Sequence, residues 1–427
     1  MDEAKLGLER YYTEDLPGIG GKLRKTPDDF VVDEVSLKPP EKPSGAVVIA
    51  RVWHRNWEAN RLVRRLGSNL RIGRPGIGFA GTKDGRSIAT QLMSFRGVSV
   101  EDVKALEIPD VRILEAYAAD RMISIGDLIG NRFAVNVKDI DEGVEVSEVC
   151  RCVKSKLAEI GGFPNYFGVQ RFGSIRPITH MIGSDLVRGD FEGAVMRYVA
   201  NPIGNGSEGE DARHALQETG DFSQAMKDLP QKFTFERVMV SHLVERPGDY
   251  VGAIRRLPRN LQMMFVHAYQ SYIFNRILSE RLRRGLPIHL PIAGDIVLPL
   301  NKNGVPDQDR PIAVTHDNLE KVRRNSSEGK AFVSGVLFGS ESVLAGGEMG
   351  EIESDLVGRE GISREDFQIV GLREASSKGT RRELLAAVND IGIFANDDAA
   401  RFEFTLNKGC YATVLLREFM KAGITSY

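Results

Sequence analysis

Asp84 is the carboxylate whose neighbours best suit chemistry. It lies between Lys83 and Arg86 in a glycine-flanked loop that follows the apolar run from Ile77 to Ala80. Neighbouring positive charge keeps a carboxyl group ionised, which suits a nucleophile or a general base. A surface ion pair is the commoner explanation for such spacing, and the spacing alone favours that explanation.

A stretch rich in arginine covers residues 51–74, where seven arginines face a single acid, Glu58. The whole-chain balance hides it, because 57 basic and 59 acidic side chains leave a net charge of −2. Arginine pairs with phosphate through two hydrogen bonds and stacks on bases, so the stretch favours a nucleic-acid partner over a solvated helix face. The aromatic residues interleaved with the arginines are Trp53, His54 and Trp57.

A third segment, Pro164 to Gly173, is dense in aromatic, amide and glycine residues. Amide and arginine groups beside aromatic faces can hydrogen-bond and stack an unpaired base. Core packing is the alternative explanation for Phe167.

Other patterns argue against a cofactor or a metal. Gly76 to Gly81 satisfies G-x-G-x-x-G, but Pro75 precedes it and no helix start follows, so the dinucleotide-binding context is missing. The seven histidines show no ligand spacing, and three cysteines cannot build a disulfide framework or a four-cysteine zinc site. We therefore predict neither a metal nor an organic cofactor.

The coarse pattern predicts interleaved strands and helices. The last forty residues are too short to fold alone, so we expect them to complete the sheet begun at the amino terminus and the middle of the chain to be inserted. An acidic tract at 341–366 is expected to be a solvated surface. Expected strands are 30–32, 46–50, 77–80, 133–137 and 402–406, and expected helices are 59–70 with Asn56 as its cap, 146–160 and 265–282.

Length and composition add broad limits. The chain has 427 residues, 42% of them apolar, which is enough for two or three domains with a buried core. No apolar run approaches eighteen residues, and the amino terminus is charged, so the expectation is a cytoplasmic protein.

The motifs resemble the TruD-type tRNA pseudouridine synthases. Asn165 to Gly173 is similar to their signature N-Y-F-G-x-Q-R-F-G, and Ala80 to Asp84, with Ala89 to Gln91 downstream, is similar to their catalytic motif. The matches follow the family order over nearly the whole chain. Further similar segments are Leu23–Phe30, Gly130–Phe133, Gly379–Arg382 and Lys408–Thr413. Gly85 and Cys410 depart from the family pattern, where lysine and serine are common.

The resemblance implies an α+β fold. A pseudouridine-synthase core with a mixed, mostly antiparallel sheet flanked by helices would be split by an inserted α/β TRUD domain. The core would occupy residues 1–160 and 386–427, ending in strands and a helix, and the inserted domain residues 161–385.

The resemblance also implies a site. Asp84 would be the catalytic carboxylate, ionised in a site closed to water. Its cation would be Arg24, with the adjacent Lys25 or Lys83 as alternatives. Asn131 would orient it, Phe133 would pack under the target base, and Arg381 would join Arg382 in holding phosphates. The full set of expected substrate-binding residues is Arg24, Lys83, Asn131, Phe133, Gln170, Arg171, Phe172, Arg382 and Tyr411.

The function implied is isomerisation of a uridine, at position 13, to pseudouridine in tRNA. The reaction would need no cofactor and no metal, and the chain would act as a monomer without a membrane. A non-catalytic RNA-binding protein of the same fold is the alternative, and the presence of Asp84, Asn131 and Phe133 favours the enzyme.

Overall fold

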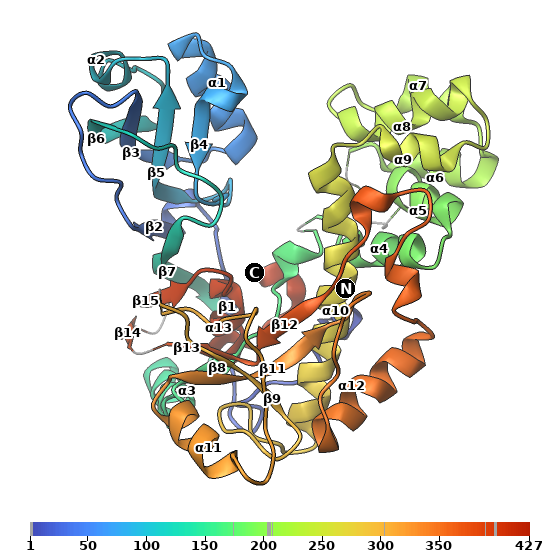
Figure 1. Ribbon diagram of the computed structural model, residues 1–427. Coiled ribbons are helices and arrows are strands. Elements are labelled where there is room, and N and C mark those ends of the chain that lie inside the picture. Colours follow the sequence, from blue (N-terminus) through green and yellow to red (C-terminus); the bar gives the residue numbers. More distant parts are fainter. Residues whose placement is uncertain are drawn as a thin grey trace. The chain divides into compact units, whose positions relative to one another are not determined.

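The computed structural model describes residues 3–173, 175–202, 206, 208–302, 304–388, 390–396 and 399–427 (Figure 1). Contacts divide the chain into two compact units. One, here called the split unit, joins Tyr11–Asn165 to Ala386–Tyr427, and the other, the middle unit, joins Met1–Arg10 to Tyr166–Leu385. The split unit is thus built from two stretches that lie far apart in the sequence.

The split unit is organised around one large sheet. Its strands are β1 Gly20–Lys22, β2 Phe30–Ser36, β3 Val47–Arg55, β4 Ile77–Phe79, β5 Ile88–Arg96, β6 Val111–Ala119, β7 Leu128–Ile140, β8 Gly162–Pro164, β13 Leu385–Ala387, β14 Ile391–Ala395 and β15 Ala399–Asn407. Its helices are α1 Ala59–Leu70, α2 Val100–Lys104, α3 Val146–Glu159 and α13 Ala412–Met420.

The order of the large sheet is β14-β15-β7-β2-β5-β3-β6, with β1 also paired to β7 and β4 to β5. Strand β15 runs along β7 from the pair Ala399 and Lys138 to the pair Asn407 and Gly130. This pairing confirms that carboxyl-terminal strands complete the amino-terminal sheet. The sheet is mixed, since β2 and β5 pair in parallel while β7 pairs with both of its neighbours in antiparallel fashion.

The parallel pair decides which loops meet. Val31 of β2 stands opposite Ile88 of β5, so both strands begin at the same edge of the sheet. The residues just before Phe30 and those just before Ile88 are therefore neighbours in space. The second of these segments is the loop that holds Asp84.

Helix α1 covers one face of β3 and β5. Leu62 and Leu66 are fully buried in a core with Val52 and Met93, and burying each leucine contributes about 1.5–3 kcal/mol. The helix is capped by Glu58, whose carboxylate accepts hydrogen bonds from the backbone N–H groups of residues 60 and 61. The expected cap, Asn56, is wrong, because that residue has a φ of 58° and stands two positions too early.

Helix α13 covers the β15 part of the same face. The rings of Phe402 and Phe419 lie 5.0 Å apart. In the pairing register, Phe404 of β15 stands opposite Phe133 of β7, and Phe133 stands opposite Val32 of β2. Residues at alternate positions share a face, so one continuous surface runs from β15 across β7 to β2.

The middle unit is largely helical. Its helices are α4 Thr179–Val187, α5 Phe191–Val199, α6 Glu210–Thr219, α7 Phe222–Asp228, α8 Thr234–Glu245, α9 Tyr250–Arg255, α10 Arg259–Arg283, α11 Leu319–Ser327 and α12 Gly347–Glu360, and its strands are β9 Ile296–Pro299, β10 Ile312–Ala313, β11 Ala331–Leu337 and β12 Thr380–Glu383. Helix α10 is the expected long helix and begins earlier than predicted. Within the described residues, no helix is long and apolar enough to cross a membrane.

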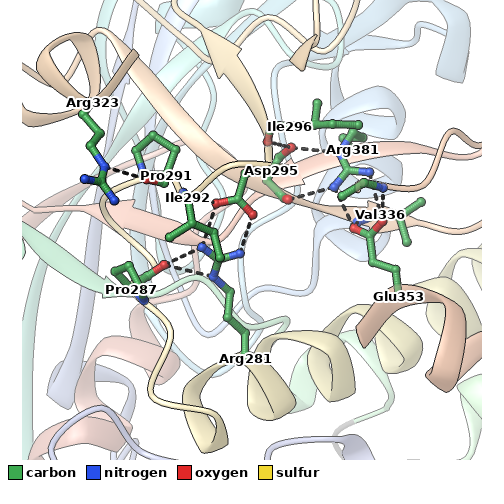
Figure 2. A network of polar contacts seen from close by, with 12 residues as sticks. Arg281, Pro287, Pro291, Ile292, Asp295, Ile296, Arg323, Val336, Glu353 and Arg381 are labelled. Atoms are coloured by element: carbon green, nitrogen blue, oxygen red, sulfur yellow. Dashed lines mark hydrogen bonds and ion pairs between the residues drawn. The ribbon is translucent and has the colours of Figure 1, made fainter. Parts of the chain in front are cut away.

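Two buried ion pairs cross-link the middle unit (Figure 2). Arg281 of α10 and Asp295 are both fully buried, with nitrogen-to-oxygen distances of 2.6 and 2.9 Å. Glu353 of α12 is also fully buried and pairs with Arg381 of β12 at 2.6 Å. The expectation that residues 341–366 form only a solvated surface is therefore wrong at Glu353.

Removing one partner of such a pair leaves the other charge buried and uncompensated. We predict that Asp295→Asn lowers the free energy of unfolding of the middle unit by about 3–5 kcal/mol, because the fully buried Arg281 would then lack a compensating negative charge. Calorimetric melting measures the effect. Glu328→Gln, in the exposed pair with Lys330, is the matched control and should leave the melting temperature nearly unchanged. Equal decreases in the two variants would contradict the prediction.

Candidate active site

The loop between β4 and β5 carries Asp84 and is anchored at its far end. The Ser87 hydroxyl donates to the backbone carbonyl of Asp84 at 2.6 Å, and Ser87 is fully buried. Arg86 donates to the carbonyl of Lys25 at 2.7 Å. The Asp84 side chain itself is 45% exposed. The expected site closed to water is therefore not present in the protein alone.

Arg24 is the cation that contacts Asp84. Its guanidinium donates to Oδ2 of Asp84 at 2.6 Å, and its side chain is only 12% exposed. Burial lowers the pKa of Arg24 from its ordinary value, and the carboxylate of Asp84 opposes that shift. The adjacent Lys25 pairs instead with Asp139, and Lys83 pairs with Glu34. Of the three candidate cations, only Arg24 contacts Asp84.

The backbone of Arg24 is unusual, with a φ of 56° in the left-handed region. With this backbone conformation, the guanidinium of Arg24 lies over the ring of Phe30, and its carbon is 3.9 Å from the ring centroid. An arginine packed on an aromatic face is held by attraction to the ring and loses less freedom on contacting an anion. The aromatic ring thus fixes the cation that faces Asp84.

Phe133 extends this contact into an aromatic cluster. Its ring lies 6.0 Å from Phe30, edge to face, and 5.4 Å from Phe404, stacked. Phe133 is only 7% exposed. Asn131, two residues earlier on the same face, is half-buried, and its Oδ1 is buried without a hydrogen-bond partner among the described residues. In the described structure Asp84 is contacted by Arg24 and not by Asn131, so the expected hydrogen bond that orients Asp84 is not present.

Lys83 does not present its charge to solvent. Its Nζ donates to Oε2 of Glu34 at 2.5 Å, and the two side chains are 5% and 0% exposed. Sequence reasoning missed Glu34. The sequence does indicate that Glu34 is buried, because it alternates with Phe30 and Val32 on the face that β2 buries.

His54 and Gln91 form a second buried polar pair on this face. Their Nε2 atoms are 3.4 Å apart, and both residues are almost fully buried. Burial and the charge of Lys83 lower the pKa of His54 to about 4. The ring is therefore neutral near pH 7. Nδ1 of His54 and Oε1 of Gln91 have no hydrogen-bond partner among the described residues. The same is true of Nε of Arg24.

Tyr411 is the residue just before α13. It follows the end of β15 at which Leu406 pairs with Asn131 of β7. Nζ of Lys408 donates to the carbonyl of Gly126 at 3.0 Å, and the N–H of Gly126 donates to the carbonyl of Ala80 at 2.8 Å. These bonds bring the segment before Tyr411 to the start of the Asp84 loop. The split unit thus gathers six expected residues: Arg24, Lys83, Asp84, Asn131, Phe133 and Tyr411.

The remaining expected residues, Gln170, Arg171, Phe172 and Arg382, belong to the middle unit. The two arginines lie over the ring of Phe167. The guanidinium carbons of Arg382 and Arg171 lie 4.2 and 5.6 Å from its ring centroid. Gln170, which precedes Arg171 in the sequence, is half-buried. Phe172 is fully buried and packs edge-on against His180, so its placement supports core packing and gives no support to base stacking.

Arg381 cannot serve as a phosphate contact. It is 5% exposed, and its guanidinium is held by Glu353 and Ser334 (Figure 2). That expectation is wrong, because a motif does not reveal how deeply a side chain is buried. The adjacent Arg382 is also buried, at 8% exposed, and its guanidinium lies over the ring of Phe167.

The glycine motif at 76–81 ends a short 3₁₀ turn, Arg74–Gly76, and forms strand β4. The next described helix, α2, begins only at Val100, so a helix that could receive a pyrophosphate does not follow the motif. Across the described ranges, no three histidine, cysteine or carboxylate side chains come together in a way that could hold a metal ion.

The arginine stretch divides into paired and unpaired residues. Arg51 pairs with Asp33 and Arg55 with Asp28. Arg64 and Arg65 are exposed on α1 and have no carboxylate partner in the part of the chain that the structure describes. They line a cleft of about 560 Å³ together with Trp57, Arg61, Ser68 and Pro109. Here it is called the α1 cleft.

A mixed sheet built from both ends of the chain, with an arginine-paired aspartate at the shared edge of its parallel strands, is the core of a pseudouridine synthase. Comparison with known proteins supports this class. The family model described as tRNA pseudouridine synthase D (TruD) matches residues 5–419. The chain belongs to this family.

Relatives match over their full length. Proteins from Methanococcoides burtonii and Thermococcus onnurineus, each named "Probable tRNA pseudouridine synthase D", are 39% and 37% identical to this chain. They cover 98% and 99% of it, and 97% and 100% of their own lengths. A crystal structure from Methanosarcina mazei, described as a provisionally assigned TruD, is 36% identical with a TM-score of 0.84 and covers 99% of this chain and 98% of its own.

The neutral state of His54 makes stability depend on pH. The pKa of histidine in an unfolded chain is about 6.5, whereas His54 has a pKa of about 4 in the fold. Between these values the unfolded chain binds a proton that the fold excludes, so stability falls as the pH falls. We predict that His54→Gln reduces the drop in melting temperature between pH 7 and pH 5. An unchanged drop would contradict a buried neutral imidazole.

Proposed function

We propose that this protein isomerises uridine to pseudouridine in tRNA, with Asp84 as the reacting carboxylate. The contact between Asp84 and Arg24 at 2.6 Å, continued through Phe30 to the ring of Phe133, carries the proposal. Through these contacts the carboxylate of Asp84 is connected, by way of Arg24, to the aromatic cluster of Phe30 and Phe133. The names of the curated relatives support the catalytic interpretation over the non-catalytic one.

The reaction keeps every atom of the substrate. The glycosidic bond between C1′ and N1 breaks, the base turns, and a bond between C1′ and C5 forms, after which the proton on C5 is lost and N1 takes up a proton. No electrons leave the nucleoside and no water is added. A carboxylate and a shaped pocket therefore suffice in principle.

Two routes suit a single carboxylate. Asp84 either adds covalently to the substrate or removes a ribose proton to give a glycal. Both routes use the carboxylate form, which in the structure accepts a hydrogen bond from the guanidinium of Arg24. Because the carboxylate is 45% exposed in the free protein, the bound RNA itself would exclude water and strengthen the contact with Arg24.

The target base has to leave its stack, at a cost of a few kcal/mol. Stacking on an aromatic side chain returns about 1–3 kcal/mol per base. Tyr411 and the small exposed part of Phe133 are the aromatic groups for this role. The unpaired Oδ1 of Asn131 supplies an acceptor for a donor of the nucleoside.

The tRNA would be held by phosphate contacts at the α1 cleft. Arg382, which is only 8% exposed and lies over the ring of Phe167, would support the surface of the middle unit by packing. The target is uridine 13 of tRNA, and the protein acts as a monomer in the cytoplasm. Gln170, Arg171 and Phe172 would contribute through the surface that surrounds Phe167, with Phe172 acting by packing. Residues 161–385 would form the inserted domain, which corresponds closely to the second stretch of the middle unit.

Asp84→Asn tests the chemistry. The amide keeps the size of the side chain but removes its charge, so turnover should fall by about 10⁴-fold or more. The affinity for tRNA should stay within about threefold, because binding depends on phosphate contacts. Pseudouridine mapping of the tRNA and filter binding measure the two effects.

Asp139→Asn is the matched control for that experiment. Asp139 is equally exposed, at 45%, and also pairs with a neighbouring cation, Lys25. It should retain turnover. Wild-type pseudouridine formation by Asp84→Asn would refute the assignment.

The α1 cleft is tested by salt dependence. Replacing Arg64 and Arg65 by glutamine should weaken tRNA binding and lower the slope of log K against log salt by about 0.9 for each phosphate that the protein no longer neutralises. Arg151→Gln, which removes an exposed arginine already paired with Glu148, should leave the slope unchanged. If the double variant kept the wild-type slope, the α1 cleft would not belong to the tRNA surface.

A further inference from the structure

The residue before Asp84 is one half of a buried ion pair. The side chains of Lys83 and Glu34 are 5% and 0% exposed, and their charged atoms lie 2.5 Å apart. Within the split unit this pair is far more buried than the contact between Arg24 and Asp84. A lysine at the surface of a loop would need no such partner.

Glu34 is fully engaged. Besides Lys83, its carboxylate accepts from the Ser36 hydroxyl at 2.6 Å and from the N–H of Leu92 at 3.3 Å. The parallel ladder of β2 and β5 ends at the pair Asp33 and Thr90. Glu34 therefore satisfies a backbone donor just beyond the point where the two strands stop pairing.

The pair thus joins three segments: β2 through Glu34, β5 through Leu92, and the Asp84 loop through Lys83. Apart from its contact with Arg24, the exposed side chain of Asp84 has little packing to hold it, so its position also depends on the backbone on either side. Ser87 fixes the residue from the carboxyl-terminal side. Lys83 is the corresponding anchor on the amino-terminal side.

We infer that Glu34 and Lys83 are positioning residues for Asp84. The inference rests on the proposed function. A buried ion pair adds little net stability, because desolvation offsets the attraction between the charges. Its effect is to specify one loop conformation, and a displacement of about 1 Å at a reacting group can cost about 10²-fold in rate.

Glu34→Gln removes the charge and leaves the shape. We expect kcat to fall by about 10²-fold, with KM for tRNA within about threefold of the wild type, because phosphate contacts dominate binding. The amides of residues 81–87 should exchange with deuterium faster, since the loop no longer has its anchor. A purely structural role would lower the melting temperature without this separation of kcat from KM.

A second variant separates positioning from stability. Glu34→Gln combined with Lys83→Met removes both charges, and replacing a whole buried pair by neutral groups is often neutral for stability. We expect the melting temperature to recover while kcat stays low and exchange at 81–87 stays fast. Recovery of kcat together with the melting temperature would overturn the inference.

Glu353→Gln is the matched control. Glu353 is also fully buried, pairs with Arg381, and accepts from two backbone N–H groups, those of Val336 and Ala345. Its replacement should lower the melting temperature and leave kcat and exchange at 81–87 unchanged.

The exchange measurement keeps the two ideas distinct. If the wild type makes no pseudouridine but the Glu34 variants still loosen residues 81–87, the proposed function fails and the anchoring stands. If exchange at 81–87 is unchanged in both Glu34 variants, the positioning inference fails whatever the activity.

Discussion

The parallel pairing of β2 with β5 is the constraint on which the site depends. Antiparallel neighbours would bring the start of one strand to the end of the other. The parallel register instead sets the segment before Phe30 beside the segment before Ile88. Only then can Arg24 reach a carboxylate sixty positions later. The aromatic cluster follows from the same sheet, because register across β2, β7 and β15 aligns Phe133 with Phe404 on the face that Phe30 also occupies.

Charge around this edge is arranged in layers of different burial. Glu34 and Lys83 are hidden within the protein, Arg24 is largely covered by Phe30, and Asp84 is open to solvent. Asp84, the proposed reacting group, is thus the least buried member of the series, and Glu34 and Lys83, its proposed positioning residues, are the most buried. Such an order lets the scaffold remain rigid while the carboxylate stays accessible to a large substrate. The desolvation that strengthens electrostatic contacts is left to the substrate's own surface.

Much of this arrangement could be predicted from the sequence. Periodicity indicated α1, α3 and most of α10, and the short terminal strands indicated that both chain ends share a sheet. Family resemblance predicted the contact of Asp84 with Arg24, with Lys25 and Lys83 as open alternatives. Exposure could not be predicted, because it depends on contacts between distant segments. For that reason the sequence does not reveal that Arg381 and Glu353 are buried, and it indicates the burial of Glu34 only through the alternation of its strand.

The pairing of β15 with β7 has a consequence for how the chain is made. The two strands are separated by more than 250 positions, all of which leave the ribosome before the last strand can dock. Until then the edge of β7 is unpaired and the ring of Phe133 lacks Phe404 as a neighbour. The middle unit can meanwhile fold from its own local helices. The aromatic cluster is therefore completed last, so a chain released early from translation has Asp84 but lacks the contact between Phe133 and Phe404.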